Sequence, residues 1–326
     1  GAPGGPGIFP RGSEAIVSPV RLCTTGDNRL CPDENLLRQN CFHFTMKGSA
    51  MSNLWEVHVI EFARSKDQPL IDLVNGAPPA QVLDLPFGFV LAQNGDRNVL
   101  IDTGFLNDGS GGDFSRKFGI PYWISPVRML EELGVRADDI TDIVLSHAHF
   151  DHMGSISAFT KARIFLQKRE WLSWNEAMAL PPQYGFLTAI INPDNMRSAF
   201  DAAVEHRLML VDGDKDNILP GMHVRLGEGH TLGQQFVIVE TARGRLVASG
   251  DCVYSRLNLT GHKHDGVYAP LNNGVGSIWK QLETMDRINE EIAGDLSRLI
   301  MMHDNDRWAH LPLVKEVEGF RIVKAS

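Results

Sequence analysis

The feature that most constrains this sequence is a dense group of polar side chains directly after an apolar run. Ile143-Val144-Leu145 predicts a buried strand, and His147, His149, Asp151 and His152 follow it. Imidazole nitrogens suit zinc and similar transition ions, and a carboxylate adds an oxygen ligand. A turn can direct the first two histidines at one ion while the last two residues face another. The segment therefore predicts a metal site at the end of a strand.

Three more residues with metal-binding side chains follow apolar strands later in the chain. They are His230 after the strand that ends at Leu226, Asp251 after Leu246-Val247-Ala248, and His303 after Leu299-Ile300-Met301. Each of them alone is more typical of a hydrogen-bonded loop residue. A sheet edge, however, brings distant strand ends together, so the chain offers seven candidate ligands, enough for two ions.

The pattern His-x-His-x-Asp-His, followed by a distant His, Asp and His, resembles the metallo-β-lactamase superfamily over residues 55–310. The resemblance implies an α+β fold, a four-layer αβ/βα sandwich with the metal site at one edge of its two sheets. It also implies a role for each candidate ligand: His147, His149 and His230 at the first metal, Asp151, His152 and His303 at the second, and Asp251 between both.

Two further positions extend this resemblance. Asp102 in Ile101-Asp102-Thr103-Gly104 matches the family's strand-end Asp-Thr-Gly, which implies that it orients a ligand histidine. Oxygen-reducing di-iron relatives carry glutamate where this chain has His149, so the histidine favours the hydrolytic branch.

The rest of the chain predicts one catalytic domain behind an N-terminal extension. Residues 1–50 begin with a Gly/Pro stretch and read as an extension, leader or expression remnant, and residues 51–326 as the hydrolase domain. Short strands alternate with helices: a hairpin turns at Asn94-Gly95-Asp96, one helix begins at Pro126, and another spans 278–292. Such mixed elements indicate sheets covered by helices.

Charge and cysteine usage limit the partners and the cellular location. The net charge is -9 and no run of Lys or Arg occurs, so we expect no nucleic-acid partner. No apolar stretch approaches the roughly 20 residues of a membrane span, and the start does not read as a secretory signal. We therefore expect a soluble cytoplasmic protein without a membrane partner, and leave a homodimer open. Cys23, Cys31 and Cys41 match no compact zinc pattern, and their pairing stays open.

Within the superfamily, the chain is most similar to the lactonases that open N-acyl homoserine lactones. Phe150 inside the first motif, Tyr254 three residues after Asp251, and the pair His303-Asp304 carry this resemblance. It implies that Tyr254 contacts the substrate carbonyl. The chain departs from these lactonases at Met153, where they have a small residue, and at Gly229-His230-Thr231-Leu232-Gly233-Gln234, where they have Gly-His-Thr-Pro-Gly-His.

Bulky side chains between the motifs predict an apolar substrate pocket. The candidates are Phe150, Met153, Tyr122, Trp123, Trp174, Tyr184 and Phe186, with His264 as a polar addition. Such a pocket fits an acyl chain, and it fits a flat bicyclic ring as well. The alternative substrate is therefore a fused-ring lactam or cyclic carbamate such as a benzoxazolinone.

The expected chemistry is ring opening of a cyclic ester or amide by hydroxide shared between two divalent ions, which lower the pKa of water from about 15.7 to about 7. Zinc is the favoured metal, although manganese, cobalt and iron accept the same ligands. Asp151 would shuttle the proton, and Tyr254 would donate to the oxyanion. A phosphodiesterase, a thioesterase of the same fold and a non-catalytic metal-binding module are the remaining alternatives.

Overall fold

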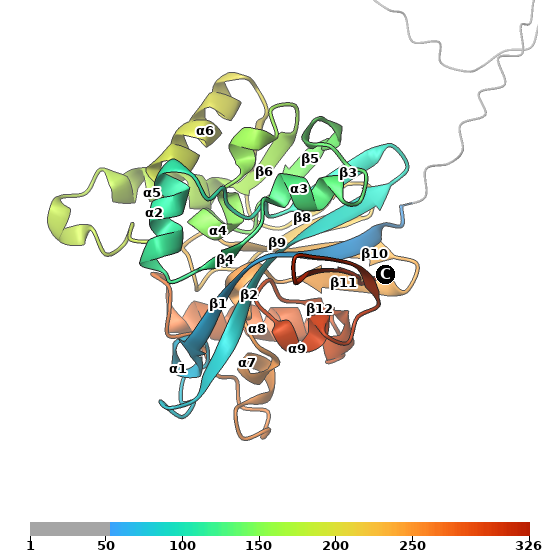
Figure 1. The fold of residues 1–326 in the computed structure, drawn as a ribbon. Coiled ribbons are helices and arrows are strands. Elements are labelled where there is room, and N and C mark those ends of the chain that lie inside the picture. Colours follow the sequence, from blue (N-terminus) through green and yellow to red (C-terminus); the bar gives the residue numbers. More distant parts are fainter. Residues whose placement is uncertain (1–52) are drawn as a thin grey trace, which may run out of the picture. The chain divides into compact units, whose positions relative to one another are not determined.

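The computed structural model describes residues 53–326, and these form two β-sheets with helices on their outer faces (Figure 1). This is the expected α+β arrangement, a four-layer αβ/βα sandwich. The predicted extension over residues 1–50, with Cys23, Cys31 and Cys41, lies outside the described residues and stays a prediction.

The larger sheet has nine strands within the described residues, in the order β13-β14-β1-β2-β3-β5-β6-β7, with β4 paired to β1. These strands are β1 (Glu56–Pro69), β2 (Val82–Asn94), β3 (Arg97–Ile101), β4 (Tyr122–Trp123), β5 (Asp142–Val144), β6 (Arg163–Gln167), β7 (Leu208–Val211), β13 (Leu313–Val317) and β14 (Phe320–Lys324). From β3 to β7 neighbouring strands run parallel, so their carboxyl ends meet at one edge.

The smaller sheet has the order β12-β11-β10-β9-β8. Its strands are β8 (Lys215–Leu219), β9 (Met222–Leu226), β10 (Gln235–Thr241), β11 (Gly244–Ala248) and β12 (Leu299–Ile300). The pair β11 and β12 is parallel, and the other pairs are antiparallel.

Helices cover both sheets, as Figure 1 shows: α2 to α6 lie beside the larger sheet, and α7 and α8 beside the smaller one, whereas α9 packs against β2. Their bounds are α1 (Leu70–Leu73), α2 (Gly109–Lys117), α3 (Pro126–Glu131), α4 (Phe150–Met153), α5 (Lys168–Met178), α6 (Pro193–Val204), α7 (Arg256–Thr260), α8 (Ile278–Glu291) and α9 (Asn305–Trp308). None of the helices in the described part of the chain is long and apolar enough to cross a membrane.

Alternation along the strands produces two buried layers, because successive side chains point to opposite faces of a sheet. In β10, Val237 and Val239 belong to a cluster that also contains Val99 of β3, so this cluster lies between the sheets. Phe236 belongs to the cluster that contains Met285 of α8, on the helix side. A strand buried on both faces reads as a continuous apolar run, which is the pattern of Phe236–Val239.

Several local predictions are confirmed. The hairpin joins β2 and β3 with Asn94 opposite Arg97, α3 begins at Pro126, and α8 begins at Ile278. Ile278 itself is exposed, because the buried face of α8 runs through Met285 and Ile288. The sequence did not predict β13 and β14, the last two strands of the larger sheet.

We expect truncation of a methionine between the sheets to be costly and truncation of an exposed strand methionine to be harmless. Met222 of β9 is fully buried, whereas Met209 of β7 is 40% exposed. Met222→Ala should lower the free energy of unfolding by about 2–5 kcal/mol, because a cavity remains where the side chain packed. Met209→Ala should change it by less than about 0.5 kcal/mol. Urea unfolding measures both, and equal losses would contradict this assignment of the core.

Candidate metal centre

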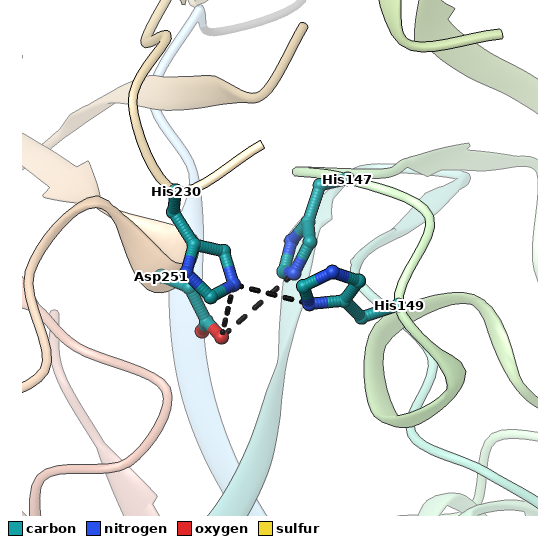
Figure 2. Close-up of side chains that lie close together, drawn as sticks. All are labelled: His147, His149, His230 and Asp251. Carbon is teal, nitrogen blue, oxygen red and sulfur yellow. Dashed lines mark hydrogen bonds and ion pairs between the residues drawn. The ribbon is translucent and has the colours of Figure 1, made fainter. Parts of the chain in front are cut away.

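The ends of three strands bring one group of four side chains together. His147 and His149 follow β5, His230 follows β9, and Asp251 follows β11; all four are buried. Their ligand atoms lie within 4.8 Å of one another, and Figure 2 shows the side chains pointing inward from opposite sides. His230 Nε2 is 3.0 Å from His149 Nδ1 and 3.4 Å from Asp251 Oδ2. We call these four residues the first cluster.

A second cluster consists of Asp151, His152 and His303, whose ligand atoms also lie within 4.8 Å of one another. Asp151 Oδ2 is 3.4 Å from His152 Nε2 and 3.5 Å from His303 Nε2. Asp251 extends to this cluster as well: its Oδ1 lies 3.1 Å from His152 Nε2 and 3.3 Å from His303 Nε2. One carboxylate therefore faces both clusters through different oxygens.

The donor atoms fit divalent metal ions. Among the residues that the structure describes, His147 Nε2, His152 Nε2, His303 Nε2 and Asp251 Oδ1 are buried without a hydrogen-bond partner. Buried polar atoms without partners are costly and rare, and a cation would satisfy all four of these. Imidazole nitrogens with carboxylate oxygens are also the ligands that zinc and related ions prefer. The two clusters could thus hold two ions.

The electrostatics of the first cluster keep its histidines neutral, which is the form that binds metal. Burial, reinforced by the neighbouring imidazoles, holds the pKa of His147 well below its usual value. Burial and the nearby His230 lower the pKa of His149 to about 3. For Asp251, burial alone would raise the pKa, but the imidazoles of His152 and His303 hold it well below its usual range.

Asp102 supports the second cluster from behind. Its carboxylate accepts hydrogen bonds from Ser146 N (2.7 Å) and Ser146 Oγ (2.8 Å), and its Oδ2 lies 2.8 Å from His152 Nδ1. The Asp102 backbone has a φ of 60°, a conformation that costs energy for most L-residues and that these contacts stabilise. His303 Nδ1 lies 2.8 Å from Pro86 O, which leaves its Nε2 for the cluster.

Gln234 occupies the position where the similar lactonases have the second histidine of their Gly-His-Thr-Pro-Gly-His run. With its side-chain oxygen facing the two nearby donors, it accepts hydrogen bonds from Asp251 N (2.8 Å) and Cys252 N (2.7 Å). This departure therefore ties the segment after His230 to the backbone of Asp251 and removes no candidate ligand.

A cavity of about 260 Å³ opens onto both clusters. Its walls combine candidate ligands, polar side chains and apolar side chains, among them Phe87, Phe118, Phe150, Leu73, Leu85, Ile190, Asn272 and Asn273. Phe118 and Phe150 stack, with ring centroids 5.4 Å apart. Leu85 and Phe87 were missed, although the alternating apolar residues before Gly88 carry the signal of a longer strand.

Of the eight predicted pocket residues, only Phe150 lines this cavity. Met153 and Trp174 are buried in the core, and Tyr122 with Trp123 borders a different cavity. The remaining three, Tyr184, Phe186 and His264, are exposed. Aromatic content alone did not separate the pocket residues from the others, because the wall also takes Leu85 and Phe87 of β2 and Ile190.

Tyr254 lies where the cavity meets the two clusters. Its ring stacks on His303 with centroids 4.8 Å apart, and its hydroxyl donates a hydrogen bond to Asp251 Oδ2. Burial, followed by the charge of Asp251, raises the pKa of the phenol well above its usual value, so the group stays protonated. Asp304 follows His303 but lies outside this cavity.

Comparison with known proteins gives one consistent result. The family model described as the metallo-beta-lactamase superfamily matches residues 89–303. The N-acyl homoserine lactonase AiiA of Bacillus thuringiensis subsp. kurstaki is 28% identical over 196 residues, covering 57% of this chain and 71% of that protein. The N-acyl homoserine lactonase AiiB of Agrobacterium fabrum is 26% identical over 260 residues, covering 74% and 87%.

Solved structures share the fold. An N-acyl homoserine lactone hydrolase with the product N-hexanoyl-L-homoserine at its catalytic metal centre has a TM-score of 0.60 and 20% identity, covering 80% of this chain and 98% of its own. AidC, a dizinc quorum-quenching lactonase, has a TM-score of 0.58 and 20% identity, covering 82% and 94%.

We expect both metal ions to depend on Asp251, because its two oxygens face different clusters. Asp251→Ala should lower the content of both ions, and elemental analysis after gel filtration measures it. Asp212→Ala is the control, since that carboxylate is 78% exposed and pairs with Lys168 at the surface. Two full equivalents retained in Asp251→Ala would contradict a shared role.

Proposed function

This chain belongs to the metallo-β-lactamase superfamily and is a hydrolase, and we propose that it opens the ring of a small cyclic ester, with an N-acyl homoserine lactone as the favoured substrate. The observation that carries the proposal is the cavity. It joins two clusters of candidate metal ligands to an apolar wall, and the Tyr254 hydroxyl lies at the junction. The matched relatives AiiA and AiiB are N-acyl homoserine lactonases, which supports the same substrate class.

The charge of the cavity favours a neutral substrate. Among the described residues that line it there is no lysine or arginine, and Asp72 adds an acidic group at its wall. Apart from the proposed metal ions, the described residues of the cavity offer no cationic partner for the further charges of a phosphodiester or an anionic thioester. An acyl homoserine lactone carries no charge, and its acyl chain would lie against Phe87, Phe118 and Ile190. The phosphodiesterase and thioesterase alternatives are therefore weaker.

Each residue has a role in the proposed reaction. The first cluster and the second cluster would each hold one divalent ion, with zinc favoured, and Asp251 would contribute to both. When bound, the ions would acidify water and polarise the carbonyl. Hydrolysis adds water across the ring ester. The oxygen of the water joins the acyl carbon, the bond between that carbon and the ring oxygen breaks, and one proton of the water passes to the ring oxygen. Asp151, which lines the cavity, is placed to hold that proton in transit.

Tyr254 would stabilise the charge that develops on the carbonyl oxygen. Its phenol is protonated and can donate one hydrogen bond, which Asp251 accepts in this structure. With the Asp251 oxygens engaged by metal, the same hydroxyl could turn to the substrate carbonyl. Such a donor acts chiefly on the transition state, where the negative charge is largest.

The alternative substrate is a flat bicyclic ring, such as a benzoxazolinone, opened at a carbamate or lactam bond. The stacked rings of Phe118 and Phe150 favour it, because aromatic faces pack well on planar rings.

A cytoplasmic location and a homodimer remain predictions.

A panel of ring substrates tests the proposed function. The zinc-loaded protein is assayed with homoserine lactones of increasing acyl length, with unsubstituted lactones, with benzoxazolinone, and with a phosphodiester and a thioester. Highest kcat/KM on acyl homoserine lactones supports the proposal. If kcat/KM is highest on benzoxazolinone, the alternative substrate is the correct one. Turnover of phosphodiesters or thioesters alone contradicts both proposed substrate classes.

We expect Tyr254→Phe to lower kcat by about 10²–10³-fold while metal content and melting temperature stay near wild type, since losing one oxyanion donor costs about 2.7–4 kcal/mol. Steady-state kinetics on the best ring substrate measures kcat and KM separately. Tyr268→Phe is the control, because that hydroxyl is directed at Asp286 outside the cavity. Unchanged kcat and KM in Tyr254→Phe would reduce this residue to a packed aromatic.

A further inference from the structure

A buried glutamate on α5 contacts both segments that carry the histidines of the first cluster. Glu170 is fully buried and accepts four hydrogen bonds. Its Oε1 accepts from Ala148 N (3.0 Å) and Trp174 Nε1 (2.7 Å), and its Oε2 accepts from Thr231 Oγ1 (2.7 Å) and Gly233 N (3.0 Å). No motif in the sequence indicated this residue.

The partners of Glu170 are placed beside candidate ligands. Ala148 lies between His147 and His149 in the chain, and Thr231 directly follows His230. The carboxylate therefore joins two loops that are distant in sequence, one after β5 and one after β9. Through these two loops it contacts the backbone of the segments that position all three histidines of the first cluster.

Two further contacts fix the same geometry. Trp174, which donates to Glu170, also packs its ring against His149, with centroids 5.9 Å apart. At Gly233, an added Cβ would lie only 2.1 Å from Glu170 N, so the second loop passes close against the start of α5. Side-chain rearrangement has little room here, because Glu170, Trp174 and Thr231 are all almost fully buried.

Only a carboxylate satisfies this arrangement. Two of the partners are backbone N–H groups and one is an indole N–H, and all three can only donate. A glutamine would direct its NH₂ group at one of the backbone donors, either Ala148 N–H or Gly233 N–H. That donor would be left buried and unpaired, which costs more than the hydrogen bond itself contributed. No substitution of a side-chain partner can remove the conflict, because the donor belongs to the backbone.

We propose that Glu170 is the positioning residue of the first cluster, holding the loop of His147 and His149 and the loop of His230 at the spacing that one metal ion requires. The inference rests on the proposed two-ion site, not on the identity of the substrate. It predicts a selective effect, because the second cluster has a separate support: Asp102 contacts His152, and Pro86 O contacts His303.

Cobalt titration tests the proposal without an activity assay. The purified full-length protein is stripped with a chelator and titrated with Co²⁺, and the visible spectrum and bound equivalents are recorded. In Glu170→Gln, affinity for one ion should fall about 10–100-fold, the usual effect of losing a residue that orients metal ligands. The spectrum of the remaining ion should match that of His230→Ala, which lacks a first-cluster residue, and differ from that of His303→Ala.

Two companion variants keep the result decisive. Thr231→Val removes one donor with little change of shape, so it should weaken the same ion to a smaller extent, even if Glu170→Gln does not fold. Glu61→Gln is the matched control, because Glu61 is also buried but pairs with Arg64 and Arg321 N; it should bind both ions as wild type does.

Three results would overturn the proposal. They are wild-type binding of both ions in Glu170→Gln and Thr231→Val, equal weakening of both ions, or fewer than two ions in the wild-type protein. The last would also overturn the two-ion site. Two bound ions without turnover of any ring substrate would instead contradict only the proposed function.

Discussion

The arrangement of the site depends on the Asp251 carboxylate, which lies between the two clusters of candidate ligands. Its two oxygens lie among five imidazoles, with Oδ2 3.4 Å from His230 Nε2 and Oδ1 3.1 Å from His152 Nε2. Such a concentration of buried polar atoms would be unstable in an apolar core. We attribute its presence at this sheet edge to metal binding, because the atoms converge as a set of ligands. Four of these atoms have no hydrogen-bond partner within residues 53–326, and a bound cation would satisfy them.

Two other buried carboxylates support the clusters from opposite sides. Asp102 follows β3 and contacts Ser146 and His152, whereas Glu170 on α5 accepts from the loops beside His149 and His230. Both are fully buried, and each accepts several hydrogen bonds, which offsets the cost of removing its charge from water. Buried polar networks of this kind fix one conformation, and the precise spacing of metal ligands needs that rigidity.

In the cavity, the candidate metal ligands lie next to the apolar side chains that are proposed to bind the substrate. Phe87 and His303 illustrate this, because their rings meet edge to face with centroids 4.9 Å apart. Phe87 lies on β2 of the larger sheet, whereas His303 follows β12 of the smaller sheet. The same wall that supports a candidate ligand also offers apolar surface to a substrate. A substituent on the ring would therefore be bound next to the carbonyl that reacts, which is the arrangement that converts binding energy into orientation.

Sequence alone determined the candidate ligands and the fold class, because metal chemistry restricts residue types and the motif His147-x-His149-x-Asp151-His152 has a narrow spacing. Tertiary structure alone decided what surrounds them. Glu170 carries no local signal, since its four partners come from three separate segments. The cavity wall likewise depends on which apolar side chains face the site after packing, so Leu85 lines it whereas Trp174 lies behind His149. The spacing of residues along the chain identifies the candidate ligands, but the packing of distant segments fixes the orientation of those ligands and the access of substrate to them.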